Sequence, residues 1–174
     1  GEWFFFRCHE GSIHAFCAQY KACHCMKSVR KSVLVPYSPQ EMFELVSQVP
    51  DYPRFLPWCS FARVLEALPN GKVAEVGIGL AGVQQSFVTR NIELPGQQID
   101  MRLVRGPFSA LHGQWRFEAA GEGNARICRV QLDLNYQFSG FLLARLVGPI
   151  FDTIAATMVD AFIQRAHTVY GNQS

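Results

Sequence analysis

The sequence predicts an α+β fold in which a curved antiparallel sheet of about seven strands packs against one long C-terminal helix. Segments between residues 59 and 138 alternate apolar and polar side chains, as half-buried strands do. Beyond position 140, apolar residues instead recur every three to four positions, as on one face of a helix. The 174 residues are 49% hydrophobic and 17% charged, a balance that excludes a mostly disordered chain and suits a single domain.

The first elements are a strand and two short helices. Residues 28–35 alternate and are followed by a proline, which ends the strand. Ser38, Pro39 and Glu41 form a helix start, with a capping hydroxyl, a proline at the first helical position and an acid three residues after the cap. Three nearby prolines then restrict residues 51–58 to a turn and a second short helix.

Six further strands follow, each bounded by Pro, Gly or Asn. In the last two, every second side chain is apolar, which indicates a sheet with one dry and one solvated face. The six predicted strands span residues 59–68, 72–80, 83–94, 98–104, 111–120 and 126–138.

The C-terminal helix should cover the dry face of the sheet. Apolar side chains repeat at helical spacing over residues 142–166, and Gly171 ends the helix. Pro149 is expected to kink the helix or to mark a join near its start. Asp152 and Asp160 lie on the polar face, where we expect solvated charges. Because charged residues interrupt the apolar region, no segment is expected to span a membrane.

Residues 1–25 differ from the rest of the chain, since they hold four of the six cysteines and three of the five histidines. A zinc site is one interpretation, but the adjacent ligands of Cys23-His24-Cys25 and the absence of a C-x2-C pair argue against it. We expect instead a non-native or mis-called N-terminal extension that is disordered and precedes a first native residue at Met26. The predicted domain is therefore 26–171.

No arrangement of residues predicts catalysis, so we expect a protein that is not an enzyme. Residues 77–82 fit the dinucleotide pattern G-x-G-x-x-G, yet a strand-like segment follows where that site needs a helix. A glycine-rich bend is the preferred interpretation. Cys59 and Cys128 are expected to be core thiols, and His112 and His167 surface histidines.

The surplus of aromatic and aliphatic side chains predicts an apolar ligand cavity between sheet and helix. Residues 55–58 are bounded by prolines, so we expect them to form a mobile rim or lid. Among the arginines, Arg102 and Arg105 beside a Gly-Pro loop are candidates for a small anion-facing patch. The candidate ligand-binding residues are Phe55, Leu56, Trp58, Phe87, Trp115, Phe117, Tyr136, Phe151, Ile154, Met158 and Phe162.

Three stretches together resemble the coenzyme Q-binding protein family of the START-like superfamily, whose bacterial branch includes the ribosome association toxins. They are VPYSP at 35–39 with DYPRFLPWC at 51–59, GPFSALHGQWRF at 106–117, and MVDAFIQRA at 158–166. The resemblance extends over about residues 26–171. It implies a helix-grip fold with an internal hydrophobic cavity.

The resemblance also implies function. Its main implication is binding of ubiquinone or a similar lipid in support of respiration, with no other cofactor and no metal. The alternative is a toxin that binds the large ribosomal subunit, with Arg102 and Arg105 facing it, and blocks subunit joining. Older naming as polyketide cyclase or dehydrase implies an enzyme. We expect a cytoplasmic protein, peripheral at the inner membrane at most, that does not bind DNA, since the net charge is only +2.

Overall fold

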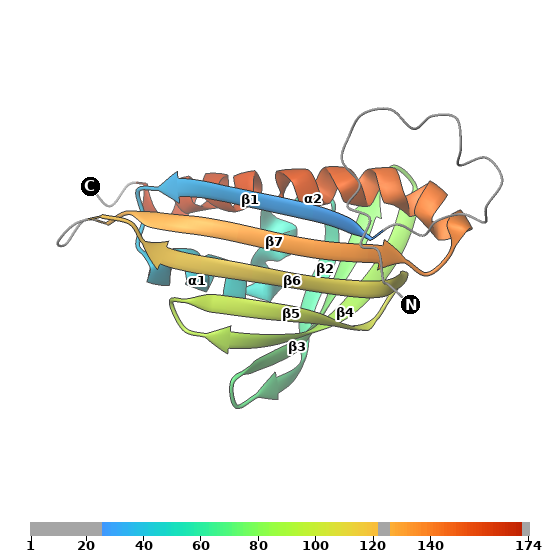
Figure 1. Ribbon diagram of the computed structural model, residues 1–174, viewed down its shortest axis with the longest axis horizontal. Helices are drawn as coiled ribbons and strands as arrows, with labels where there is room; N and C mark the ends of the chain where they lie inside the picture. The colour runs from blue at the N-terminus through green and yellow to red at the C-terminus, as the bar shows by residue number, and fades with distance from the viewer. Residues whose placement is uncertain (1–25, 122–125, 172–174) are drawn as a thin grey trace, which may run out of the picture.

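The computed structural model describes residues 26–121 and 126–171, so the extension expected at residues 1–25 lies outside the described part. The expected fold is confirmed. Seven antiparallel strands form one sheet in the order β1-β7-β6-β5-β4-β3-β2, and the helix α2 runs along it (Figure 1). The strands are β1 (Lys27–Val35), β2 (Cys59–Leu68), β3 (Gly71–Leu80), β4 (Val83–Leu94), β5 (Gln98–Arg105), β6 (Phe108–Ala119) and β7 (Cys128–Phe138). The helices are α1 (Pro39–Ser47), the 3-10 helix η1 (Val49–Arg54) and α2 (Phe141–Tyr170).

The strands β6 and β7 show the predicted alternation. Trp115 pairs with Leu132 and Phe117 with Val130, and all four side chains are buried on the face that α2 covers. Two strand starts are wrong in the prediction by more than one residue, because β6 begins three residues earlier, at Phe108, and β7 two residues later, at Cys128. The sequence before position 111 does not alternate cleanly, since a β-bulge shifts the register between the first residues of β6 and the end of β7.

The helix start after β1 is also confirmed. The Ser38 hydroxyl accepts the backbone N–H of Glu41, and the Glu41 carboxylate accepts the backbone N–H of Ser38 at 2.8 Å. Pro39 occupies the first helical position. The buried side chains of α1, Met42, Phe43 and Val46, then join the core.

The segment expected to be a lid is instead anchored. The Leu56 amide donates to the Tyr52 carbonyl at 2.9 Å, and the Trp58 carbonyl accepts the amide of Gly79 on β3, also at 2.9 Å. Leu56 is 1% and Trp58 6% exposed. The expectation of a freely moving lid is therefore wrong, because bulky apolar side chains on this segment are more stable inside the core than at a rim.

The helix α2 is continuous over 30 residues, about 45 Å at 1.5 Å per residue. It does not begin or end at Pro149, so of the two effects expected of this proline, a kink or a join, the join is wrong. Val147, Phe151 and Ile154 on either side of the proline are buried against the sheet. The free energy gained from burying these side chains exceeds the cost of the one backbone hydrogen bond that the proline cannot donate.

The polar side of α2 is tied to the sheet by charge. The Lys27 ammonium donates a hydrogen bond to the Asp152 carboxylate at 2.5 Å, and the Lys31 ammonium donates one to the Asp160 carboxylate at 2.5 Å. The two aspartates are therefore not the free solvated charges that the sequence suggested. By length and composition alone, α2 also meets the criteria for a helix that could cross a membrane. A core helix meets the same criterion, and α2 packs on the sheet.

The glycine-rich pattern at residues 77–82 forms a hairpin. Gly77 and Gly79 lie inside β3, and Ala81 and Gly82 make the turn to β4 with positive φ angles of 51° and 77°. A Cβ at Gly77 would lie 2.4 Å from the Phe61 ring, so this glycine allows the ring to cross the strand. A strand follows the pattern, and this geometry does not bind a dinucleotide.

Candidate functional site

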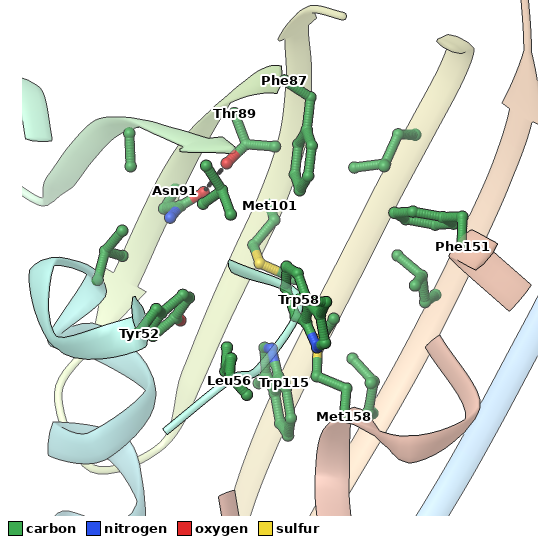
Figure 2. Close-up of a pocket in the computed structure, with 16 residues that line it drawn as sticks. Tyr52, Leu56, Trp58, Phe87, Thr89, Asn91, Met101, Trp115, Phe151 and Met158 are labelled. Carbon is green, nitrogen blue, oxygen red and sulfur yellow. Dashed lines mark hydrogen bonds between the residues drawn. The ribbon is translucent and has the colours of Figure 1, made fainter. Parts of the chain in front are cut away.

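An apolar cavity lies between the inner face of the sheet and α2. Its lining side chains come from β3, β4, β5, β6 and β7, from the region of η1 and from α2, and Figure 2 shows them converging. Six of the sequence-predicted residues line it: Leu56, Trp58, Phe87, Trp115, Phe151 and Met158.

The other five predicted residues belong to the surrounding core. Phe55, Phe117, Tyr136, Ile154 and Phe162 do not line this cavity. Phe162 supports its wall, because its ring packs edge-on against Trp115 at a centroid distance of 5.3 Å. The Tyr136 hydroxyl donates to an α2 carboxylate at 2.5 Å, so it is already engaged in the helix–sheet contact. Burial first, and then that carboxylate, raise the pKa of Tyr136.

Ten lining residues were not predicted, and two of them are polar. Thr89 and Asn91 are 4% and 5% exposed, and the Thr89 hydroxyl donates to the Asn91 side-chain oxygen at 2.8 Å (Figure 2). The alternation of side chains along a strand could have predicted both residues, since Thr89 and Asn91 share one face of β4 with the predicted Phe87. The others are Val49, Tyr52, Ala74, Val76, Met101, Leu111, Leu132 and Leu134.

The cavity is small in this conformation. The volume in which the centre of a water molecule fits is about 50 Å³. An engineered apolar cavity that takes up benzene measures about 150 Å³. Met101 and Met158 lie in the lining, and their unbranched thioether chains can adopt other rotamers at low cost. A ligand larger than a few water molecules therefore requires these walls to move outward.

The outer face of the sheet, which points away from α2, carries a row of arginines. Strand pairing and alternation place on this face Arg30, Arg63, Arg90, Arg102, Arg105, Arg116 and Arg129. The candidates Arg102 and Arg105 thus belong to a larger set, which the scattered sequence positions did not reveal.

Two carboxylates among these arginines, those of Glu75 and Asp100, are less exposed than their partners. The Arg63 side chain is 63% exposed and its partner Glu75 only 8%. Arg102 is 73% exposed and its partner Asp100 only 18%. Hydrogen bonds from Arg63, and then from a serine, lower the pKa of Glu75. Glu75 and Asp100 are therefore ionised but shielded by their arginine partners, while Glu66 and Glu118 are exposed acids on the same face.

The cysteines and histidines show no nucleophilic arrangement in residues 26–121 and 126–171. Burial raises the pKa of both Cys59 and Cys128 to about 11, as for inert core thiols. His112 contacts Asp100 at 2.9 Å on the outer face, and His167 contacts a tyrosine hydroxyl at the C-terminal end of α2. Within the described part of the chain, no group of three potential metal ligands is found. The Cys/His-rich segment lies outside that part.

Comparison with known proteins agrees with this architecture. The chain is 44% identical over 143 residues to the ribosome association toxin RatA of Pseudomonas aeruginosa, covering 82% of this chain and 97% of that protein. It is 28% identical to the mitochondrial coenzyme Q-binding protein COQ10 homolog B of Xenopus laevis, covering 82% of this chain and 59% of that protein.

The fold is shared with an aromatase/cyclase. The crystal structure of Zhui aromatase/cyclase from a Streptomyces species superposes with a TM-score of 0.68 at 16% identity, over 85% of this chain and 99% of that one. At this identity the likeness shows the fold alone. Residues 35–163 match the family model described as polyketide cyclase / dehydrase and lipid transport. The chain therefore belongs to the polyketide cyclase/dehydrase and lipid transport family, with START-like architecture.

Proposed function

We propose that this protein associates with the ribosome, at the large subunit, as a toxin of the RatA type. The observation that carries the proposal is the 44% identity to a ribosome association toxin over 97% of that relative's length. The quinone-binding interpretation, which the sequence placed first, becomes the second candidate.

The outer face of the sheet supports the proposal chemically. Its exposed guanidinium groups can contact phosphate oxygens in bidentate geometry, while Glu75 and Asp100 are shielded. Arg90 and Arg129 are exposed on the same face and have no ion pair in the described residues. A face of this kind suits the phosphate backbone of ribosomal RNA.

Sedimentation with separated ribosomal subunits tests the proposal. The full chain should sediment with large subunits at low salt and dissociate as salt increases, because phosphate contacts release counterions. The double variant Arg102→Gln/Arg105→Gln should bind more weakly, and each lost phosphate contact should reduce the salt slope by about 1.

The matched control is Arg54→Gln/Arg145→Gln, which removes two exposed arginines that are not on the sheet. This control should bind like the unmodified protein. If the protein does not sediment with large subunits at low salt, the proposed association is wrong. If both double variants bind equally well, the outer face is not the contact surface.

The apolar cavity favours a second function, the binding of ubiquinone or a similar hydrophobic molecule. Its lining is almost wholly apolar, and the matched family includes lipid transport. Native mass spectrometry of protein purified from cells, followed by lipid extraction, tests this directly. A stoichiometric lipid should be found, and its absence under conditions that retain other lipids would argue against the function.

The proposal includes no turnover. The cavity lining contains no Asp, Glu, His, Lys, Arg or Cys side chain, so no group there is suited to proton transfer at neutral pH. A cyclase-like reaction would need such a group beside the substrate. The proposed location is the cytoplasm, where ribosomes are found, and contact with the inner membrane would accompany only the second function.

A further inference from the structure

Two arginines face each other directly on the outer face of the sheet. Arg90 on β4 and Arg102 on β5 are paired in the antiparallel ladder, and like charges placed opposite each other in this way are destabilising. Arg102 donates to the Asp100 carboxylate at 3.0 Å, whereas Arg90 has no ion pair among residues 26–121 and 126–171. Along the same line of paired residues, the exposed acid Glu66 is two strands beyond Arg90, about 10 Å at the strand spacing. An anion bound between the two guanidinium groups would relieve their repulsion.

The line of paired residues continues across two more strands. His112 on β6 pairs with Arg102, and Asn135 on β7 pairs with His112, so the line Arg90-Arg102-His112-Asn135 crosses four neighbouring strands (Figure 1). The His112 Nε2 atom lies 2.9 Å from the carboxylate that Arg102 also contacts. One half-buried acid is therefore shared by two members of the line, and it holds the imidazole ring of His112 in place.

An open hollow of the outer face lies at this line. Arg102, His112 and Asn135 line it together with Met26 and Ser109, and none of the described residues that line it is an Asp or Glu. The centre of a water molecule fits in about 550 Å³ of the hollow, a volume in the range of ligand sites. A serine hydroxyl on β1 donates to the Asn135 side-chain oxygen at 2.5 Å, so this amide can meet a ligand with its N–H groups.

We infer that this line binds one unpaired nucleotide of RNA, with the phosphate between Arg90 and Arg102 and the base in the hollow against His112 and Asn135. The inference rests on the proposed ribosome association and names the RNA element that the outer face recognises. Guanidinium groups match phosphate oxygens, an imidazole ring can stack on a base, and an amide can hydrogen-bond to its edge. A base in an A-form duplex is stacked and paired, so it can enter the hollow only after being flipped out at a cost in free energy.

A phospholipid headgroup would offer the same phosphate chemistry but fits this surface less well. Side chains that enter a bilayer interface are apolar, and the line consists of charged and polar groups. The most exposed large apolar side chains, Phe141, Leu142 and Leu146, lie instead at the start of α2, on the other side of the sheet. RNA is therefore the occupant that the line favours.

Fluorescence anisotropy of the full chain with a labelled RNA of about 16 nucleotides tests the inference. The RNA is offered as a single strand or annealed to its complement, and the single strand should bind about fivefold more tightly. Arg90→Gln should weaken single-strand binding about fivefold and reduce the salt slope by about 0.7, as for one lost phosphate contact of a single strand. Because it also removes the repulsion from Arg102, the same variant should melt about 1–3 °C higher than the unmodified protein.

Two other variants separate the base from the charge. Asn135→Ala removes the amide but no charge, so it should reduce the preference for the single strand to below about twofold and leave the salt slope unchanged. Arg54→Gln is the matched control, since it removes an exposed arginine that is not on the sheet and that pairs with Asp51. It should leave RNA affinity unchanged and should not raise the melting temperature.

Equal affinity for single and double strands would overturn the inference, and so would an Arg90→Gln variant that binds the single strand as tightly as the unmodified protein. Binding to phosphatidylglycerol vesicles in place of RNA would also overturn it. Sedimentation of the unmodified protein with large subunits decides the proposed function separately. Sedimentation together with any of these results would leave the ribosome association standing, whereas the expected RNA binding without sedimentation would refute that association and leave the nucleotide site.

Discussion

Truncation of Leu56 tests whether the segment after η1 belongs to the core or forms a lid. The side chain is 1% exposed and lines the cavity. Leu→Ala substitutions at buried sites cost about 2–5 kcal/mol, and the cost is larger where the surroundings cannot collapse. Since Leu56 borders an existing space, the removed atoms add to that space. We expect a loss of about 3 kcal/mol, or a decrease in melting temperature of about 6–12 °C.

Leu65→Ala on β2 is the matched control, because it deletes the same atoms from a side chain that is 44% exposed. It should change stability by no more than about 0.5 kcal/mol. The measurement is thermal or urea unfolding of both variants. Benzene should restore part of the stability of Leu56→Ala alone, since it binds only the folded, enlarged cavity. Equal melting temperatures for the two variants would show that Leu56 is not a core residue, and the anchored segment described above would be refuted.

Three further predictions concern charge and burial. Hydrogen bonding to the Arg126 guanidinium lowers the pKa of Glu41 to about 2, against an opposing effect of burial and with a smaller contribution from the Ser38 cap. The ionised Glu41 carboxylate therefore contributes its full stabilisation above about pH 4.5, and this contribution is lost as the pH falls towards 2. Acid unfolding should therefore be shallower in Arg126→Gln, and an unchanged acid transition would contradict this pairing. Tyr136→Phe should lower stability by about 1.5–3 kcal/mol in urea unfolding, because it removes a hydrogen bond to a carboxylate, and a loss below 0.5 kcal/mol would speak against that bond. Mass spectrometry after brief thiol labelling at neutral pH should find Cys59 and Cys128 unmodified in the folded protein and labelled in urea, whereas labelling without urea would show that they are accessible.

The residues of the inner face of the sheet could be predicted from the sequence, whereas the grouping of arginines on the outer face could not. Alternation along β7 assigned its buried and exposed residues, because the strand period of two is a local property of the chain. The arginine row on the outer face is not local. Arg30 and Arg116 both contact Asp133, yet they come from strands more than 80 positions apart in the chain. Only the strand order brings them together.

The sequence by itself determined the order of the elements, the cap of α1, the amphipathic C-terminal helix and the division of the sheet into a dry and a wet face, since propensity, capping and periodicity act over a few residues. The tertiary structure decided the rest. It placed Thr89 and Asn91 in the cavity, held Leu56 in the core, kept α2 continuous through Pro149 and used the Tyr136 hydroxyl for a helix contact. Each of these outcomes depends on which side chains meet across strands and helices, and burial against distant partners outweighs the local preferences that a single segment carries.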